Sequence, residues 1–525
     1  MSEASLILSN ANVLTLASRQ PKAQAISIKD GKIIGVGANK EVSTYVGKET
    51  KIIDCRGKTI VPGLVDCHVH MKDFGLFLRQ VDLRNAKSIE EMKKTLIQHV
   101  KSHSKQPWII GGRWDHEKLK EKRYPTRLDL DSVIPNKPTL LMRVCGHLAV
   151  VNSKALRLAG ITKHTKVRGG EVELDPKTGQ PNGVLKDNAI DLVSKIVPKL
   201  GKDATEEACA LACKKAVETG LTGVHWLLSS SEEMNVLQEM CEDGTLPLRI
   251  YLGIPERLLD HVLALGISSG FGNEMLKIGF IKILSDGSLG AQTAALKRPY
   301  SDNPKKRGMM LYSQRILQKI VIKAHTNGWQ LGIHAIGDRA IENVLDTYEE
   351  ALKKVPAENH RHRIEHCSIL SERLISRMRK LGIIASVQPH FVISDFWTID
   401  RVGPERARWA YPFKSLLEKG IVIASGSDCP IELINPLLGI WAAVARNDKI
   451  NERLSAEEAL KTYTSNAAYA SFDEDTKGTI EKGKFADLTV LSDDPTNISR
   501  DKIRDISVEM VIVNGKIVYS KESKH

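Results

Sequence analysis

The sequence has 525 residues, of which 42% are hydrophobic and 26% are charged, a composition typical of a folded globular protein rather than a disordered chain. The formal net charge is +13 at pH 7, but the basic residues are scattered and form no long basic block. A solvated Lys-rich surface is therefore favoured over a nucleic-acid partner.

Cysteine content and apolar runs indicate the compartment. Eight cysteines in so long a chain are too sparse for a disulfide scaffold, and none form a Cys-x-x-Cys pair, so reduced thiols are expected. The stretch after Met1 lacks a basic segment, and no run of about 18 apolar residues follows anywhere in the chain. We therefore expect a cytoplasmic protein with neither an export signal nor a membrane span.

Short β-type runs separated by turns occur at both ends of the chain. Near the start two such runs flank Asp30-Gly31, and near the end two flank Asn514-Gly515. Both dipeptides favour tight hairpin turns. We expect residues 1–60 and 471–525 to form one small β-sandwich domain, into which the rest of the chain is inserted.

Between these ends, apolar β-type runs alternate with helical segments, the pattern expected of a parallel α/β sheet. The expected strands are residues 59–66, 220–227, 247–254, 277–284, 329–334, 363–366, 382–387 and 420–425. Eight strands are the number of a closed (β/α)8 TIM-like barrel, which we assign to residues 61–470. The first interval is far too long for one βα unit, so an inserted subdomain is predicted at about residues 71–200.

Metal-binding residue types occur where several expected strands end, which is where barrel enzymes place their working residues. These residues are His68, His70, Lys282, His334, His366 and Asp428. Residues i and i+2 of a strand point to the same face, so His68 and His70 can reach one ion. Four histidines and one aspartate suit zinc and are acceptable to iron, nickel or manganese. Lys282 fits such a cluster if carbon dioxide converts it to an anionic carbamate.

Each of these residues taken alone has a simpler explanation. The His68 and His70 pair could be an accident of the surface, and His334 or His366 could be a hydrogen-bonded core histidine. Lys282 could form a salt bridge at a strand end, and Asp428 could cap the next helix. Because they occur together and in barrel order, a metal site is favoured over these explanations.

Several segments carry a resemblance to a known family. They are Val61-Pro62-Gly63-Leu64-Val65-Asp66-Cys67-His68-Val69-His70 and residues 282–290, 333–340, 363–366, 386–389, 426–430 and 483–488. These segments are similar to motifs of the amidohydrolase superfamily, and the similarity runs essentially from end to end. Residues 282–290 resemble the Lys-(x)3-Asp-Gly-Ser-Leu-Gly segment of the YtcJ-like branch, which includes N-substituted formamide deformylase.

This resemblance implies a site for one or two divalent metal ions, with zinc as the expected metal. It implies that His68 and His70 hold one ion together with Asp428. His334 and His366 would hold a second ion, and the carbamate of Lys282 would bridge the two. Asp428 would also be the catalytic residue, acting first as general base and then as general acid.

Four further residues are candidate substrate contacts: Arg143, His147, Asp286 and His390. Arg143 and His147 are similar to a family stretch near the substrate pocket. Asp286 could orient a metal ligand or simply form a turn, and His390 could belong to a wall over the pocket or to surface packing. The chain departs from its relatives at Asp187, where they often have glutamate, which leaves any role for Asp187 open.

The reaction class that fits is hydrolysis of a non-peptide C–N bond in an amide, N-substituted formamide or cyclic amide by a metal-activated water. One alternative is a deaminase or imidazolone-type ring hydrolase of a heterocycle, which Lys282 disfavours. Another is a non-catalytic binding protein of the same fold. The expected partner is a small-molecule substrate, with no nucleic acid and no membrane, and homo-oligomerisation stays open.

Overall fold

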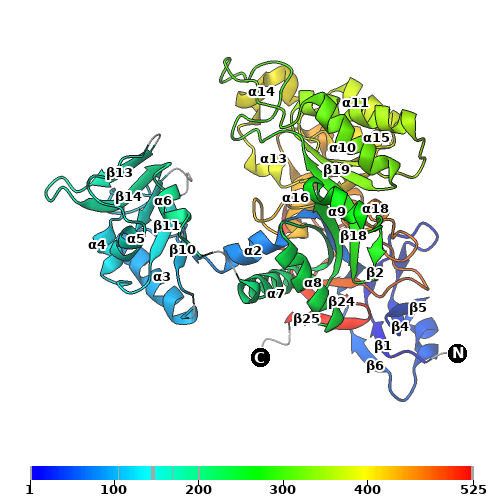
Figure 1. Ribbon diagram of the computed structural model, residues 1–525. Coiled ribbons are helices and arrows are strands. Elements are labelled where there is room, and N and C mark those ends of the chain that lie inside the picture. The colour runs from blue at the N-terminus through cyan, green and yellow to red at the C-terminus, as the bar shows by residue number, and fades with distance from the viewer. Residues whose placement is uncertain (1–2, 105, 144–147, 168–169, 199–200, 522–525) are drawn as a thin grey trace. The chain divides into compact units, whose positions relative to one another are not determined.

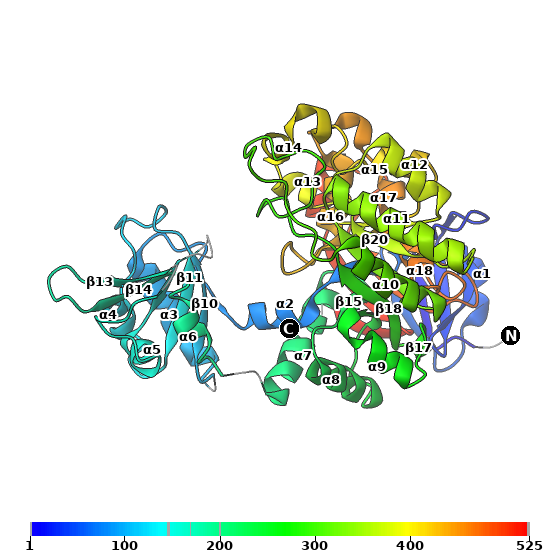
Figure 2. The same cartoon turned by 45° about the horizontal axis from the view of Figure 1, so that its top comes forward.

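The computed structural model describes most of the chain, and the described residues form two compact units (Figures 1 and 2). The described ranges are 3–104, 106–143, 148–167, 170–198 and 201–521. The barrel unit combines Met1–Lys72 with Cys209–His525, and the inserted unit comprises Asp73–Ala208. For comparison, the sequence predicts an inserted subdomain at about residues 71–200.

Eight parallel strands form the barrel of the barrel unit, as predicted (Figure 1). Their order is β22 (Ile423–Ser425), β21 (Ile384–Val387), β20 (Arg363–His366), β19 (Gln330–Ala335), β18 (Leu276–Leu284), β16 (Arg249–Pro255), β15 (Leu221–Leu227) and β8 (Leu64–Val69). A short strand, β17 (Phe271–Gly272), pairs antiparallel with β18. All residues of β8, β15, β16 and β20 are buried, which explains why β8, β15 and β16 are mainly apolar, whereas β20 carries the charged residues Arg363 and Glu365.

Helices connect the barrel strands and cover the barrel. They are α7 (Lys202–Glu218), α8 (Ser231–Glu242), α9 (Leu259–Ala264), α10 (Gln314–Thr326), α11 (Asp338–Lys354), α12 (Glu372–Lys380), α13 (Phe391–Ser394), α14 (Thr398–Ala407), α15 (Phe413–Glu418), α16 (Pro436–Ala445), α17 (Ala456–Thr462) and α18 (Ser465–Ala470). Four of them begin after a serine whose hydroxyl accepts a backbone N–H of the first turn: Ser230, Ser313, Ser371 and Ser455. Such caps satisfy donors that the helix itself leaves unpaired.

The first predicted strand, residues 59–66, is in fact two strands that belong to different sheets. β7 (Thr59–Pro62) lies in a terminal sheet, and β8 begins the barrel after Gly63. A Cβ atom on Gly63 would come 2.1 Å from Oγ1 of Thr222, so only glycine lets the chain pass here. The sequence did not reveal this break, because both strands are fully buried and apolar residues occur on both sides of Gly63.

Both ends of the chain contribute to two further sheets of the barrel unit. One has the order β5 (Lys32–Gly37), β4 (Ala25–Lys29), β1 (Leu6–Ser9), β6 (Lys51–Asp54), and α1 (Asn39–Val42) follows β5. The other has the order β25 (Lys516–Ser520), β24 (Val508–Val513), β23 (Leu488–Leu491), β7, β2 (Asn12–Leu14), β3 (Lys22–Ala23). One hydrophobic cluster includes Leu8 and Ile26 of the first sheet and Leu488 and Ile512 of the second. The β-sandwich arrangement of the two sheets stays a prediction.

The two predicted hairpins are confirmed, and their turns contact each other although they come from opposite ends of the chain. Asp30-Gly31 joins β4 to β5, and Asn514-Gly515 joins β24 to β25, all four residues having positive φ. Arg249 of the barrel then binds Asp487, with 2.6 Å between Nε and Oδ2, and the Asp487 carboxylate accepts the Asn514 N–H. This chain of contacts links the barrel to the terminal sheets.

The inserted unit is built on one six-stranded sheet. Its order is β13 (Gly170–Leu174), β14 (Pro181–Asp187), β12 (Leu148–Val151), β11 (Thr139–Arg143), β10 (Ile109–Trp114), β9 (Val81–Asp82). Its helices are α3 (Ile89–Ser102), α4 (Arg127–Asp131), α5 (Ser153–Leu158) and α6 (Asp191–Ser194), and α2 (Met71–Leu78) leads into it. Leu141 and Val150 belong to one hydrophobic cluster, and their neighbours Leu140 and Val151 belong to another. The sheet therefore buries both faces.

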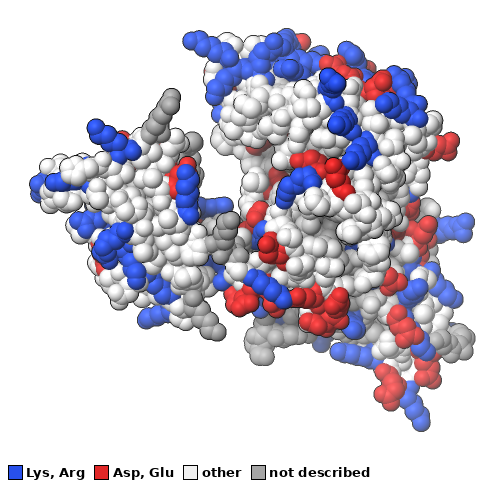
Figure 3. All heavy atoms as spheres, in the orientation of Figure 1, with Lys and Arg blue, Asp and Glu red and all other residues white. Residues whose placement is uncertain are grey.

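The visible face of the molecule shows Lys and Arg scattered over both units, with Asp and Glu interspersed among them (Figure 3). Within the described ranges, no helix combines the length and apolar character that crossing a bilayer requires.

Candidate metal centre

The first and last strands of the barrel, β8 and β22, meet through two backbone hydrogen bonds of the residues near their ends, and this junction brings the first candidate ligands together. The Asp428 N–H donates to the His68 carbonyl over 2.8 Å, and the His70 N–H donates to the Cys429 carbonyl over 2.9 Å. Buried Asp66 reinforces the junction, because its Oδ1 accepts the backbone N–H groups of His68 and Ser427, each over 3.0 Å. Residues 360 positions apart, 68 and 428, are thus held side by side.

The side chains at this junction face a common point. Nε2 of His68 lies 3.4 Å from Oδ1 of Asp428, and Nε2 of His70 lies 3.3 Å from the same oxygen. All three ligand atoms lie within 4.8 Å of one another. Two ligands at about 2.1 Å from one tetrahedral ion are about 3.4 Å apart, so the spacing suits a divalent metal.

His334 and His366 lie beside this group, at the ends of β19 and β20. Their ring centroids are 4.3 Å apart, and the His366 ring lies 4.8 Å from that of His68. Burial lowers the pKa of His334 to about 3 and that of His366 well below its usual value, so both are neutral imidazoles. Neutral imidazole is the form that binds metal ions.

His366 reaches the group through an unusual backbone conformation. Strand alternation would place it on the face opposite Glu365, but φ is +77° at His366 and +49° at Cys367. This left-handed turn brings the ring beside His68 and His334. Asp428 also has a positive φ, +59°. Such conformations cost about 1–3 kcal/mol each in a non-glycine residue and tend to occur at functional sites.

Lys282 lies on β18 with its side chain inside the barrel. It is 7% exposed, and its Nζ has no hydrogen-bond partner among the described residues. Burial lowers its pKa to about 8. A buried ammonium without a partner is costly. An anionic carbamate at this position would instead provide oxygen ligands beside the histidines, so the donor set as a whole fits divalent metal ions.

Sequence reasoning missed a buried ion pair behind His68. Glu365 accepts a hydrogen bond from the His68 ring over 2.6 Å, and Arg363 donates to the same carboxylate over 2.5 Å. The available signal was the presence of two charged residues, Arg363 and Glu365, two positions apart in a strand expected to be buried. Residues of that kind need partners in the core.

The carboxylate of Asp286 accepts three backbone N–H groups, and its predicted contact with substrate stays a prediction. Its Oδ1 accepts the Ile336 N–H over 3.1 Å, and its Oδ2 accepts the N–H groups of Gly337 and Ala295 over 3.0 and 2.8 Å. The carboxylate therefore fastens the long loop after β18 to the turn that follows β19. Its Oδ1 also lies 3.5 Å from Nε2 of His334, so a role beside the ligands stays a prediction.

Replacing Asp286 with alanine is expected to lower the free energy of unfolding by about 3 kcal/mol, because three buried N–H donors lose their acceptor. Asp338→Ala is the matched control, since Oδ1 of Asp338 accepts a hydrogen bond from one backbone N–H, that of Lys297. Denaturant unfolding followed by fluorescence measures both variants. Equal losses in the two variants would contradict the fastening role.

The other candidate substrate contacts stay predictions. Arg143 ends β11 in the inserted unit and donates to Oδ1 of Asp115 over 2.7 Å. His147 lies outside the described residues. His390 follows β21, and its Nδ1 lies 2.6 Å from Oε2 of Glu432. The ring of Phe391, the next residue, is nearly parallel to that of His366, with 6.4 Å between the ring centroids. This segment therefore lies next to the candidate ligands.

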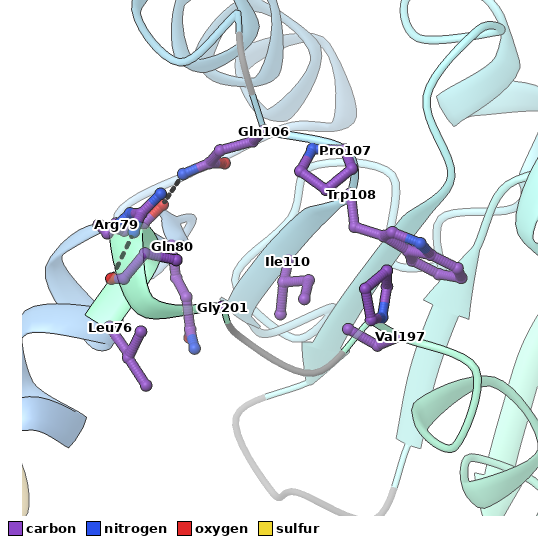
Figure 4. A pocket seen from close by; sticks show the side chains of 11 residues that line it. Leu76, Arg79, Gln80, Gln106, Pro107, Trp108, Ile110, Val197 and Gly201 are labelled. Carbon is purple, nitrogen blue, oxygen red and sulfur yellow. Dashed lines mark hydrogen bonds between the residues drawn. The ribbon is translucent and has the colours of Figure 1, made fainter. Parts of the chain in front are cut away.

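The inserted unit has a cavity of about 420 Å³ near the points where the chain enters and leaves this unit (Figure 4). Leu76, Trp108, Ile110 and Val197 line it, and Arg79 at its edge donates to the Ala204 carbonyl. As far as the chain is described, its lining has no histidine, cysteine or carboxylate. The cavity offers contact surface to an apolar group but no acid, base or metal ligand, so the candidate chemistry lies in the barrel.

Comparisons with known proteins identify one matching family and several similar proteins. The family described as "Amidohydrolase family" matches residues 51–519. YtcJ of Bacillus subtilis, named only provisionally as an amidohydrolase, is 35% identical over 97% of this chain and 98% of its own length. N-substituted formamide deformylase of Arthrobacter pascens is 28% identical over 98% of both chains.

A solved structure resembles the fold over nearly its whole extent. It is the crystal structure of an uncharacterized metal-dependent hydrolase from Pyrococcus furiosus, with a TM-score of 0.80 and 31% sequence identity. The match covers 94% of this chain and 100% of that chain. The likeness therefore includes the barrel and most of the remaining structure.

Proposed function

The chain belongs to the amidohydrolase family, and from that membership we propose that it hydrolyses a non-peptide C–N bond in a small amide, with N-substituted formamides as the first candidates. The coarse assignment, to the metal-dependent amidohydrolases, follows from the family and from the solved relative. The finer assignment is supported by the full-length similarity to N-substituted formamide deformylase.

One observation supports the proposal above the others. A lysine buried without a hydrogen-bond partner among the described residues, Lys282, shares the barrel mouth with four histidines and Asp428. A lysine that bridges two ions as a carbamate would explain why it is buried there. We propose zinc as the metal because imidazole and carboxylate ligands suit it, with His68, His70 and Asp428 around one ion and His334 and His366 around a second.

The residues of the chain have distinct tasks in this proposal. When bound, the ions would lower the pKa of a water from about 15.7 toward about 7 and polarise the carbonyl. Asp428, whose Oδ1 lies between two imidazoles, takes a proton from the attacking water and passes it to the leaving nitrogen. The water oxygen bonds to the carbonyl carbon and the C–N bond breaks, which yields a carboxylic acid and an amine.

The proposed function is tested with protein purified without chelator. Elemental analysis should find one to two transition-metal ions per chain. A panel of N-formyl amines, N-acyl amino acids and cyclic ureas, assayed by amine release, should contain at least one substrate. The double variant His68→Asn, His70→Asn serves as the control for contaminating activity and should be inactive.

Two outcomes would contradict this proposal. Protein that contains no metal and binds none on addition would remove its central claim. Activity on aminopurines or aminopyrimidines with release of ammonia, and on none of the amides, would favour the deaminase instead. The non-catalytic alternative predicts metal binding or ligand binding without turnover of any compound.

A further inference from the structure

Glu365 lies inside the barrel between a candidate metal ligand and a buried arginine. It is 0% exposed, and Arg363 donates to both of its oxygens, the bond from Nη2 to Oε2 being 3.1 Å long. Oε2 lies 2.6 Å from Nδ1 of His68, and Oε1 accepts the Nε–H of Arg363 over 2.5 Å. The carboxylate is therefore held from one side and directed toward His68 on the other.

Arg363 is itself fixed in position by the barrel interior. Its guanidinium donates to the Cys67 carbonyl over 2.5 Å, to Oγ of Ser386 over 2.8 Å and to Nδ1 of His225 over 2.8 Å. These partners lie on three strands, β8, β21 and β15. Because so many bonds orient the guanidinium, the Glu365 carboxylate has little freedom to move away from His68.

This arrangement determines which nitrogen of His68 is available to an ion. A carboxylate only accepts hydrogen bonds, so Nδ1 of His68 carries a proton, and in the neutral imidazole that binds an ion Nε2 then has the free lone pair. Nε2 is the atom that lies 3.4 Å from Asp428. His366 has a weaker version of the same arrangement, since its Nδ1 lies 2.6 Å from the neutral amide oxygen of Gln388.

We infer that Glu365, held by Arg363, is a positioning residue that fixes the tautomer and orientation of His68 for metal binding. This inference rests on the metal site of the proposed function. Hydrogen-bonded carboxylates behind metal-binding histidines typically contribute about 10- to 100-fold to metal affinity. The charge and the number of bonds behind His68 make Glu365 the strongest such partner in the described site.

The test measures zinc affinity rather than turnover. Metal-free protein competes with a chromophoric chelator for zinc in the unaltered form, in Glu365→Gln and in Glu365→Asp. The glutamine removes the charge, and the aspartate withdraws the carboxylate from His68 while leaving a charge near Arg363. Both are expected to raise the zinc dissociation constant about 10- to 100-fold.

Glu233→Gln is the matched control. Glu233 is also 0% exposed and accepts hydrogen bonds from Trp226 and Ser229, neither of which is a candidate ligand. Its replacement is expected to lower thermal stability and to leave the zinc dissociation constant within about twofold. A purely structural Glu365 would behave in the same way, so unchanged zinc affinity in both Glu365 variants would overturn the inference.

If neither Glu365 variant folds, the double variant Arg363→Met, Glu365→Met removes both buried charges together, which proteins often tolerate. It is expected to fold and to bind zinc about 10- to 100-fold more weakly. Affinity equal to that of the unaltered protein would overturn the role of Glu365. Absence of zinc binding in the unaltered protein would instead overturn the metal site itself.

Discussion

Replacing Asp428 with asparagine is expected to lower kcat/KM at least about 1,000-fold on whichever amide the unaltered protein hydrolyses best. Asparagine keeps an oxygen at the position between His68 and His70 but cannot accept the proton of the attacking water. General acid–base groups typically contribute about 100- to 10,000-fold. Because a ligand oxygen remains, metal content should fall much less than activity.

Asp473→Asn is the matched control for that variant. Asp473 is also buried and forms ion pairs with Lys277 and Lys477. Lys277 lies at the start of β18, at the opposite end from the candidate site. This control should lose thermal stability and keep its kcat. Activity within about tenfold of the unaltered value in Asp428→Asn would exclude Asp428 as the proton carrier.

Replacing Lys282 with alanine is expected to lower the metal content by at least one ion per chain and kcat by about 100-fold or more. The carbamate would be the ligand shared by both ions, so its loss removes an anionic bridge that no neighbouring residue replaces. Short carboxylic acids such as formate, acetate and propionate should restore part of both properties, because they can occupy the vacated space as oxygen ligands.

Lys277→Ala is the control on the same strand. Lys277 lies at the start of β18, five positions before Lys282 (282 minus 277), and its side chain pairs with Asp473 rather than with any candidate ligand. Its replacement removes that ion pair and should leave metal content and kcat unchanged. Full metal content and activity in Lys282→Ala, with no effect of added carboxylic acids, would show that Lys282 does not bridge.

Much of the barrel could be predicted because most of its strands are mainly apolar runs of the expected length. The run predicted at 220–227 is β15 at Leu221–Leu227, and the run at 363–366 is β20 at Arg363–His366. The break at Gly63 could not be predicted, because apolar residues continue on both sides of it. The residue that Gly63 approaches closely there is Thr222, 159 positions later in the chain (222 minus 63).

The candidate site could be predicted only in part, again because some of its contacts join residues far apart in the sequence. Strand ends point to His68, His334 and Asp428, since the barrel brings those ends to one rim. The pairing of His68 with Glu365 spans 297 positions and depends on side-chain direction inside the closed barrel. The left-handed backbone at His366 also has no local signal, because residues other than glycine adopt it only uncommonly.

The junction between β22 and β8 has a consequence for how the protein opens. Both backbone hydrogen bonds there involve candidate ligands or a direct neighbour, Cys429, so an ion bound to His68, His70 and Asp428 would cross-link the first barrel strand to the last. Such a cross-link closes a chain loop of 360 residues (428 minus 68). A ligand that binds the native state stabilises it, and here the stabilised region would be the junction between β22 and β8. Loss of the metal would therefore favour local separation of β22 from β8 before the whole protein unfolds.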